Sequence, residues 1–476
     1  MFQPSIKSRG LKRLALSVAA LAGLILAPFP ALTQSGDGGI PLIRDAETEA
    51  YLRKMCDPIF VAAGLDPSAV HIYLVNDGSI NAFVAEGQNI FVFTGLLTSA
   101  PSPNALVGVL AHETGHMAGG HMLRTSEAMG KIQRPTLIGM LLGIGAMIGG
   151  APDVGAAVLT GAQTIGVRNA LAYTRVQEAA TDHAAVRYLE ATHQSGQGLL
   201  DFFQQLSRRE IQTSRKIDPY QVDHPLSAER ISLLERAVNA SPYVNTKDTP
   251  EAIAQLKLIQ GKISGFLEKP DIVLRRYPLT DKSAGARYAR AAADYRQGLL
   301  ADGLSEIDSL IQDEPKNPYF WELKGQMLFE SGKVVEALEP YRASVKYLPR
   351  DGLIRVGLGQ ALINAAETQN NNSALLDEAV AVLTVAKEVD RELPIAWRFL
   401  AQAYSDKSDP VMADYATAEL NAATGNIMEA GRFAMRAQGK LKRGTVAYNR
   451  AQDIIALATD AQQQMRQQQQ RAQRRR

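Results

Sequence analysis

The sequence has little cysteine, little histidine and little net charge, and it lacks an apolar run long enough to span a membrane. Its single cysteine, Cys56, excludes an internal disulfide. A formal net charge of +2 gives no reason to expect nucleic acid as a partner. The contents of 46% apolar and 21% charged residues are those of a globular protein, and 476 residues suffice for two or three domains.

The N-terminus has the form of a signal peptide. Four basic residues between Lys7 and Arg13 precede the uncharged apolar run Leu14–Leu26, which Pro28 and Pro30 follow. The run has 13 residues, whereas a transmembrane helix needs about 20. We therefore predict a cleaved signal peptide over residues 1–33 and a periplasmic location, with a membrane anchor as the alternative.

Two of the seven histidines, His112 and His116, flank Glu113 in an H-E-x-x-H pattern. The breaker cluster Pro101–Pro103 and the apolar run Asn104–Ala111 precede the pattern and predict a buried helix. Histidines four residues apart project from one face of a helix, so both imidazoles can bind one Zn²⁺. The Glu113 carboxylate would then be placed to take a proton from bound water.

A third ligand is expected from a second predicted helix, Thr174–Glu190. A catalytic zinc ion needs three protein ligands and one open position, and Glu178 is the best candidate for the third. Asp182 lies one turn further on and could accept a hydrogen bond from a ligating imidazole. A solvated acidic face explains this spacing equally well.

A small sheet is predicted before the metal helix, from the strands Val70–Val75 and Asn89–Phe93 and a strand and turn over Asn81–Gln88. Its edge at Asn81, Ala82 and Phe83 is a candidate substrate-binding site, because an extended peptide can add to a free edge. A structural hairpin gives the same pattern.

Residues 137–167 form a stretch rich in Gly, Leu, Ile and Met. Each half is too short to span a bilayer, and together they exceed a typical loop. A helical hairpin packed in the core, a lid over the active site and a hairpin that dips into the membrane all remain open.

The C-terminal half shows a period of 34 residues. Pro315 and Pro349 are separated by this interval, and so are Gly325 and Gly359. The period predicts three to four tetratricopeptide repeats over residues 286–460, with 263–285 as a connecting segment and an ordinary helical bundle as the alternative. Residues 461–476 form a basic, low-complexity tail that could touch anionic lipid or a partner.

The motifs resemble those of the HtpX-like, prenyl-protease-type zinc metallopeptidases. The resemblance rests on His112–His116, on Glu178 and Asp182 in an E-x-x-x-D pattern, and on Asn81–Phe83 with Thr94–Leu97, and it covers about residues 40–460. The periplasmic branch with a tetratricopeptide tail matches best. The resemblance implies a mostly helical protein: an α+β zincin-type domain with a small sheet over residues 34–262, then an all-α tetratricopeptide solenoid.

The resemblance also implies roles for individual residues. His112, His116 and Glu178 would bind zinc, and Glu113 would act as the general base. The segment Asp223–Pro225 would correspond to a loop whose histidine, His224, can occupy the open metal position and hold the enzyme inactive.

Arg230 falls where the family has an arginine near the site. The chain departs from the family in two respects. Its single cysteine rules out a disulfide that couples the two domains, and Gly119-Gly120 replaces polar residues after His116.

The motifs together with the resemblance imply two alternative functions. The first is a periplasmic zinc endopeptidase that degrades misfolded or misassembled envelope proteins and supports outer-membrane protein assembly. The second is a chaperone or adaptor that binds clients through its repeats and rarely cleaves them. The resemblance implies misassembled outer-membrane β-barrel proteins as substrates, and the β-barrel assembly machinery as a partner of the repeats.

Overall fold

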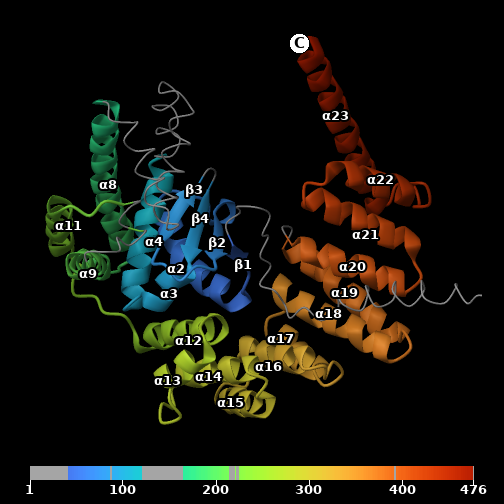
Figure 1. The fold of residues 1–476 in the computed structure, drawn as a ribbon, viewed down its shortest axis with the longest axis horizontal. Helices are drawn as coiled ribbons and strands as arrows, with labels where there is room; N and C mark the ends of the chain where they lie inside the picture. Colours follow the sequence, from blue (N-terminus) through green and yellow to red (C-terminus); the bar gives the residue numbers. More distant parts are fainter. Residues whose placement is uncertain are drawn as a thin grey trace, which may run out of the picture. The chain divides into compact units, whose positions relative to one another are not determined.

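The computed structural model describes residues 41–85, 88–120, 165–213, 220, 224–390 and 393–474 (Figure 1). The predicted signal peptide and almost all of the glycine-rich stretch 137–167 lie outside these residues, so both predictions stay open. The chain divides into two compact units. The first consists of the described residues within 1–44, 56–99 and 104–246, and the second of those within 45–55, 100–103 and 247–476.

A four-stranded sheet forms part of the first unit, in the order β1-β2-β4-β3. Strand β4 pairs in parallel with β2 and antiparallel with β3, and β1 pairs antiparallel with β2. The edge strand β3 therefore has β4 as its one strand neighbour among the described residues. The strands are β1 (Leu42–Ile43), β2 (His71–Val75), β3 (Ala82–Ala85) and β4 (Asn89–Phe93).

The three predicted strands are confirmed, and β1 was not predicted. Alternation fixes their faces, since Val84, Ile90 and Val92 are buried while Phe83 and Phe91 on the opposite face are partly exposed.

Helices account for most of the rest of the first unit. The predicted metal helix is α4, which begins at Pro103, a residue suited to the first helical turn. The predicted helix Thr174–Glu190 is part of a longer one, α8. The helices are α2 (Ala46–Ala62), the 3₁₀ turn η1 (Pro67–Ala69), α3 (Thr94–Ser99), α4 (Pro103–Ala118), α8 (Ile165–Ala191), α9 (Gln197–Thr213) and α11 (Ala228–Ala240). Residues 46–55 of α2 and Pro103 of α4 belong to the second unit.

Helix α9 packs closely against α4 because of two glycines. A Cβ on Gly108 would lie 2.7 Å from the Cβ of Leu199, and a Cβ on Gly198 would lie 2.4 Å from the backbone N of Ala105. The Asn104 side chain joins the same segments, since it donates to the carbonyl of Ser195 and accepts from the N–H of Gly198. These contacts fix the start of the metal helix.

The second unit, apart from its N-terminal segments, is a succession of helices. They are α12 (Pro250–Leu267), α13 (Pro270–Arg276), α14 (Ala284–Arg296), α15 (Leu300–Asp313), α16 (Pro318–Glu330), α17 (Leu338–Tyr347), α18 (Gly352–Thr368), α19 (Ser373–Val389), α20 (Pro394–Asp406), α21 (Pro410–Ala423), α22 (Ile427–Gln438) and α23 (Val446–Arg474). The predicted connecting segment 263–285 is thus largely helical, and α23 includes most of the predicted tail.

The 34-residue period has a packing cause. A Cβ on Gly325 of α16 would lie 2.8 Å from the Tyr341 ring of α17, and a Cβ on Gly359 of α18 would lie 2.5 Å from Leu383 of α19. Each glycine therefore lets one helix approach the next. Residues 369–372 connect α18 to α19, and Asn370 in this connection has a positive φ of 55°. These helix pairs agree with the tetratricopeptide prediction, which stays a prediction.

A buried ion cluster lies near the start of the second unit. The Lys262 ammonium on α12 lies 2.6 Å from Asp45 and 3.2 Å from Glu47, and the Tyr288 hydroxyl donates to Glu47. The carboxylates outweigh the effect of burial and raise the pKa of Lys262 well above its usual value. The cluster therefore contains a permanent buried cation that needs its acidic partners.

The predicted fold class is confirmed: a mostly helical chain with a small sheet, followed by an all-helical region. Within the described residues, we find no helix with the length and apolarity needed to cross a membrane.

Candidate active site

The site lies where α4 meets α8. A Cβ on Gly115 would lie 2.8 Å from the Thr181 methyl carbon, so only glycine allows this approach. Thr181 stands between Glu178 and Asp182 in the sequence, and the contact brings both carboxylates against the two histidines of α4. The predicted convergence of the two helices is therefore present in the structure.

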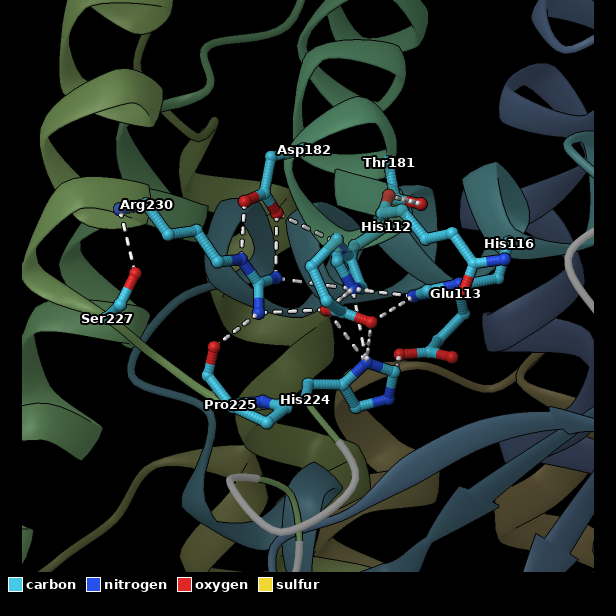
Figure 2. Close-up of polar contacts among 11 residues, drawn as sticks. His112, Glu113, His116, Thr181, Asp182, His224, Pro225, Ser227 and Arg230 are labelled. Carbon is cyan, nitrogen blue, oxygen red and sulfur yellow. Dashed lines mark hydrogen bonds and ion pairs between the residues drawn. The ribbon is translucent and has the colours of Figure 1, made fainter. Parts of the chain in front are cut away.

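Three side chains direct donor atoms at one point (Figure 2). The Nε2 atoms of His112 and His116 are 3.1 Å apart, and Glu178 oxygens lie 3.3 Å from the first and 3.1 Å from the second. Donors about 2.05 Å from a tetrahedral zinc ion lie about 3.3 Å from one another. The observed spacing is therefore that of adjacent corners of a zinc tetrahedron.

His224 supplies a fourth donor to this cluster. Its Nδ1 atom lies 3.3 Å from His112 Nε2 and 3.2 Å from a Glu178 oxygen. The four donor atoms lie within 4.8 Å of one another, and all four residues are buried. The other nitrogen of the ring, Nε2, lies 3.4 Å from Glu113. The imidazole thus fills the space between the candidate metal position and the Glu113 carboxylate.

Asp182 and Arg230 support the cluster from behind. An oxygen of Asp182 lies 2.9 Å from His112 Nδ1, and Nε2 of that ring is directed at the centre. The Arg230 guanidinium donates to both carboxylate oxygens of Asp182, at 2.6 and 2.9 Å, and its Nη1 atom lies 2.8 Å from Oε2 of Glu178. Burial raises the pKa of Asp182, but hydrogen bonds from Arg230 and His112 outweigh it and hold the pKa below its usual range.

The ring of Phe203 on α9 packs over the Arg230 guanidinium, whose central carbon lies 4.9 Å from the ring centroid.

The pKa values of the two histidines of α4 are shifted in opposite directions. Burial acts on both, but Asp182 and Glu178 raise the pKa of His112 to about 9, whereas desolvation lowers the pKa of His116 to about 4. The carboxylates thus favour positive charge at His112.

The charge balance indicates a divalent cation. Three buried carboxylates, those of Glu113, Glu178 and Asp182, face one buried guanidinium, Arg230, and each of the four is at most 5% exposed. Metal ligation requires neutral imidazoles, and with both histidines of α4 neutral the ionised groups among the described residues of the site sum to two negative charges, which are costly to bury without compensation. The donor set and this deficit together suggest a metal ion bound at the cluster.

The structure brings six predicted residues together: His112, Glu113, His116, Glu178, His224 and Arg230. Asp182 joins them through His112. Asn81, Ala82 and Phe83 lie on or beside β3 and make none of the polar contacts given above, so their substrate-binding role stays a prediction.

Sequence reasoning missed two aromatic residues that pack on the site, Phe203 and Tyr220. No motif marks either residue. It also missed the part that Gly115 plays, although a glycine between two ligands of a helix is a signal of close packing.

Comparison with known proteins agrees with this geometry. Residues 46–238 match the sequence model of peptidase family M48, and this range contains the entire cluster. The chain carries a family M48 peptidase domain. It is accordingly a metallopeptidase, as the sequence predicted.

Two relatives cover most of the chain at low identity, and a third covers a short part of it. The beta-barrel assembly-enhancing protease of Yersinia pestis is 23% identical over 411 residues, which are 85% of this chain and 82% of that protein. The protein of the same name from Escherichia coli K12 is 22% identical over 412 residues, 86% of this chain and 82% of its own. Mitochondrial metalloendopeptidase OMA1 of Schizosaccharomyces pombe is 30% identical over 90 residues, 19% of this chain and 26% of that protein.

Proposed function

We propose that this protein is a periplasmic zinc endopeptidase that degrades misfolded or misassembled envelope proteins and supports outer-membrane protein assembly. The observation that carries the proposal is the set of donor atoms from His112, His116 and Glu178, spaced as in a zinc tetrahedron, next to a buried glutamate.

In this proposal, His112, His116 and Glu178 hold the zinc ion. Imidazole nitrogens and one carboxylate are the ligand set of many catalytic zinc sites. A bound zinc ion supplies Lewis-acid polarisation of the scissile carbonyl and of the attacking water.

Glu113 acts as the general base. Its carboxylate takes a proton from the attacking water as the water oxygen bonds to the carbonyl carbon. The same proton passes to the amide nitrogen as the C–N bond breaks, and this returns Glu113 to its starting state. Complete burial removes competing water from Glu113 and strengthens its interaction with the polarised substrate.

Asp182 and Arg230 position the ligands. Asp182 fixes the His112 tautomer, and Arg230 holds Asp182 and Glu178 in one orientation. His224 acts as an inhibitory fourth ligand, because its imidazole occupies the space that a substrate carbonyl needs. Substrate would bind as an added strand on β3, along Asn81, Ala82 and Phe83.

The substrate class comes from the relatives, whose names describe enhancement of β-barrel assembly. Residues 286–460 would act as tetratricopeptide repeats that hold such clients or the assembly machinery. The succession of helix pairs over α14–α23 supports this role of the repeats. It also favours a second function, in which the chain is mainly an adaptor or chaperone.

The test replaces Glu113 with Gln. We expect Glu113→Gln to retain one bound zinc ion per chain, because Glu113 is outside the ligand set, and to cleave an unfolded protein at least about 100-fold more slowly. Exposed Glu229→Gln on α11 is the control and should behave as wild type. Full cleavage activity in Glu113→Gln would overturn the assignment.

The same variant tests the proposed substrate class. Crosslinking Glu113→Gln in cells and identifying the trapped proteins should enrich β-barrel proteins or their assembly factors. A trap that contains only diverse unfolded chains would instead indicate a general housekeeping protease.

A further inference from the structure

Three aromatic side chains form one row across the sheet of the first unit. Phe83 on β3 pairs with Phe91 on β4, and Phe91 pairs with Tyr73 on β2. The ring centroids are 4.8 and 5.1 Å apart, with interplanar angles of 11° and 21°. These spacings match the distance between neighbouring strands, about 4.7–4.9 Å, so the rings stack in step with the sheet.

The row ends at the edge strand. Phe83 is its last member among the described residues, and it remains partly exposed although Phe93 packs against it edge-on, with ring centroids 6.0 Å apart. A segment that adds to β3 would place one side chain beside Phe83 at the same strand spacing. An aromatic ring there would continue the stack, and aromatic pairs gain energy beyond the area they bury.

Only one residue of an added strand would lie beside the Phe83 ring. The residues before and after it in that strand would project to the opposite face of the sheet, since side chains alternate along a strand. The next positions on the same face lie opposite Asn81 and Ala85, which offer no ring. The row therefore selects one residue in an extended segment rather than general apolar character.

We propose that Phe83, backed by Phe91, forms a specificity subsite for one aromatic side chain of an extended substrate segment, at a fixed distance from the scissile bond. The inference rests on the proposed binding of substrate to β3. It adds a substrate class to that function: segments of β-strand character that carry an aromatic residue at a single defined position. Stacked rings also stabilise a sheet by themselves, and the experiment separates the two roles.

The experiment compares the wild type with Phe83→Leu and Tyr73→Leu. Both variants remove one ring of the row, but Tyr73 is two strands away from the edge and cannot touch an added segment. The zinc-loaded proteins digest a library of denatured proteome peptides, and mass spectrometry locates the cleaved bonds. A chelator control identifies metal-dependent cleavage.

We expect the wild type to show aromatic enrichment at one fixed position from the cleaved bond. A peptide pair with Phe or Ala at that position should differ about two- to tenfold in kcat/KM. Phe83→Leu should bring the ratio close to one, Tyr73→Leu should keep it, and Phe83→Trp should restore it.

Metal-dependent cleavage without aromatic enrichment in the wild type would overturn the subsite and leave the proposed function intact. Equal loss of the aromatic preference in Phe83→Leu and Tyr73→Leu would show that the row only stabilises the sheet and does not contact substrate. Absence of metal-dependent cleavage by the wild type would overturn the proposed function and the subsite with it.

Discussion

The imidazole of His224 stacks on the ring of Tyr220, with centroids 4.7 Å apart and an interplanar angle of 29°. The backbone N–H of His224 donates to the Tyr220 carbonyl at 2.8 Å, so a backbone hydrogen bond also joins the two residues. Tyr220 is fully buried, and its ring centroid lies 6.0 Å from that of Phe202 and 6.1 Å from that of Phe203. An apolar anchor thus holds His224 between Glu113 and the candidate metal ligands.

The first prediction concerns His224. If the imidazole restrains the enzyme, His224→Ala should cleave casein faster than the wild type. The gain is about tenfold for each 1.4 kcal/mol by which the closed state is favoured. Initial rates at equal zinc content measure it, with exposed His183→Ala as the control. A folded His224→Ala protein with a lower rate would instead make His224 a participant in the reaction.

The second prediction concerns the Tyr220 ring. Tyr220→Leu removes the stacking surface and should raise the basal rate part of the way towards that of His224→Ala, whereas Tyr220→Phe keeps the ring and should leave the rate unchanged. The Leu substitution should add nothing to the His224→Ala variant, because the anchored ring is then absent. Loss of cleavage in Tyr220→Phe would contradict the anchoring role, since it would assign the chemistry to the hydroxyl.

The third prediction concerns zinc affinity. Asp182→Asn weakens the contact that orients His112 and leaves Arg230 with a neutral partner, so zinc should bind about 10- to 100-fold more weakly. Competition with a chelator of known affinity measures the change. Asp201→Asn, on the exposed side of α9, is the matched control. Unchanged affinity in folded Asp182→Asn would show that His112 is oriented without the carboxylate.

Local patterns in the sequence sufficed for the elements that carry the site. The apolar run before His112 predicted α4, and the strand character of Val70–Val75, Asn81–Gln88 and Asn89–Phe93 predicted β2, β3 and β4. The Asp182–Arg230 pair could not be predicted, because its two residues are 48 positions apart and meet only through tertiary packing. Strand β1 could not be predicted, because its two residues are too few to show a periodic pattern. Tyr220 was missed because its role, like the Asp182–Arg230 contact, depends on a neighbour in space.

The fourth prediction concerns the buried ion cluster of the second unit. Lys262→Met leaves the Asp45 and Glu47 carboxylates without their cation and should lower the free energy of unfolding by about 3–5 kcal/mol. Both tryptophans of the chain, Trp321 and Trp397, belong to this unit, so their fluorescence in a denaturant titration reports its unfolding alone. Lys257→Met, exposed on the same helix, should change stability by no more than about 0.5 kcal/mol. Equal effects of the two substitutions would show that the cluster contributes no net stability.

The last prediction is a pH dependence at Glu322, whose carboxylate lies 4.0 Å from Lys262. Burial raises the pKa of Glu322 to about 7 against the opposing effect of Lys262, from a usual value of 4.5. Because the pKa is higher in the folded state, the stabilising contribution of the protonated group is complete below pH 4.5. It is lost as the pH rises through 7.

Glu322→Gln should therefore gain stability relative to the wild type as the pH rises from 4.5 to 8, by about 1–3 kcal/mol. Tryptophan fluorescence again reports the transition, and Glu339→Gln on the exposed surface of α17 corrects for a general change in charge. A stability difference that stays constant over this range, after that correction, would show that Glu322 is already ionised at pH 5. In that case the attraction of Lys262 would outweigh the cost of burying the Glu322 carboxylate.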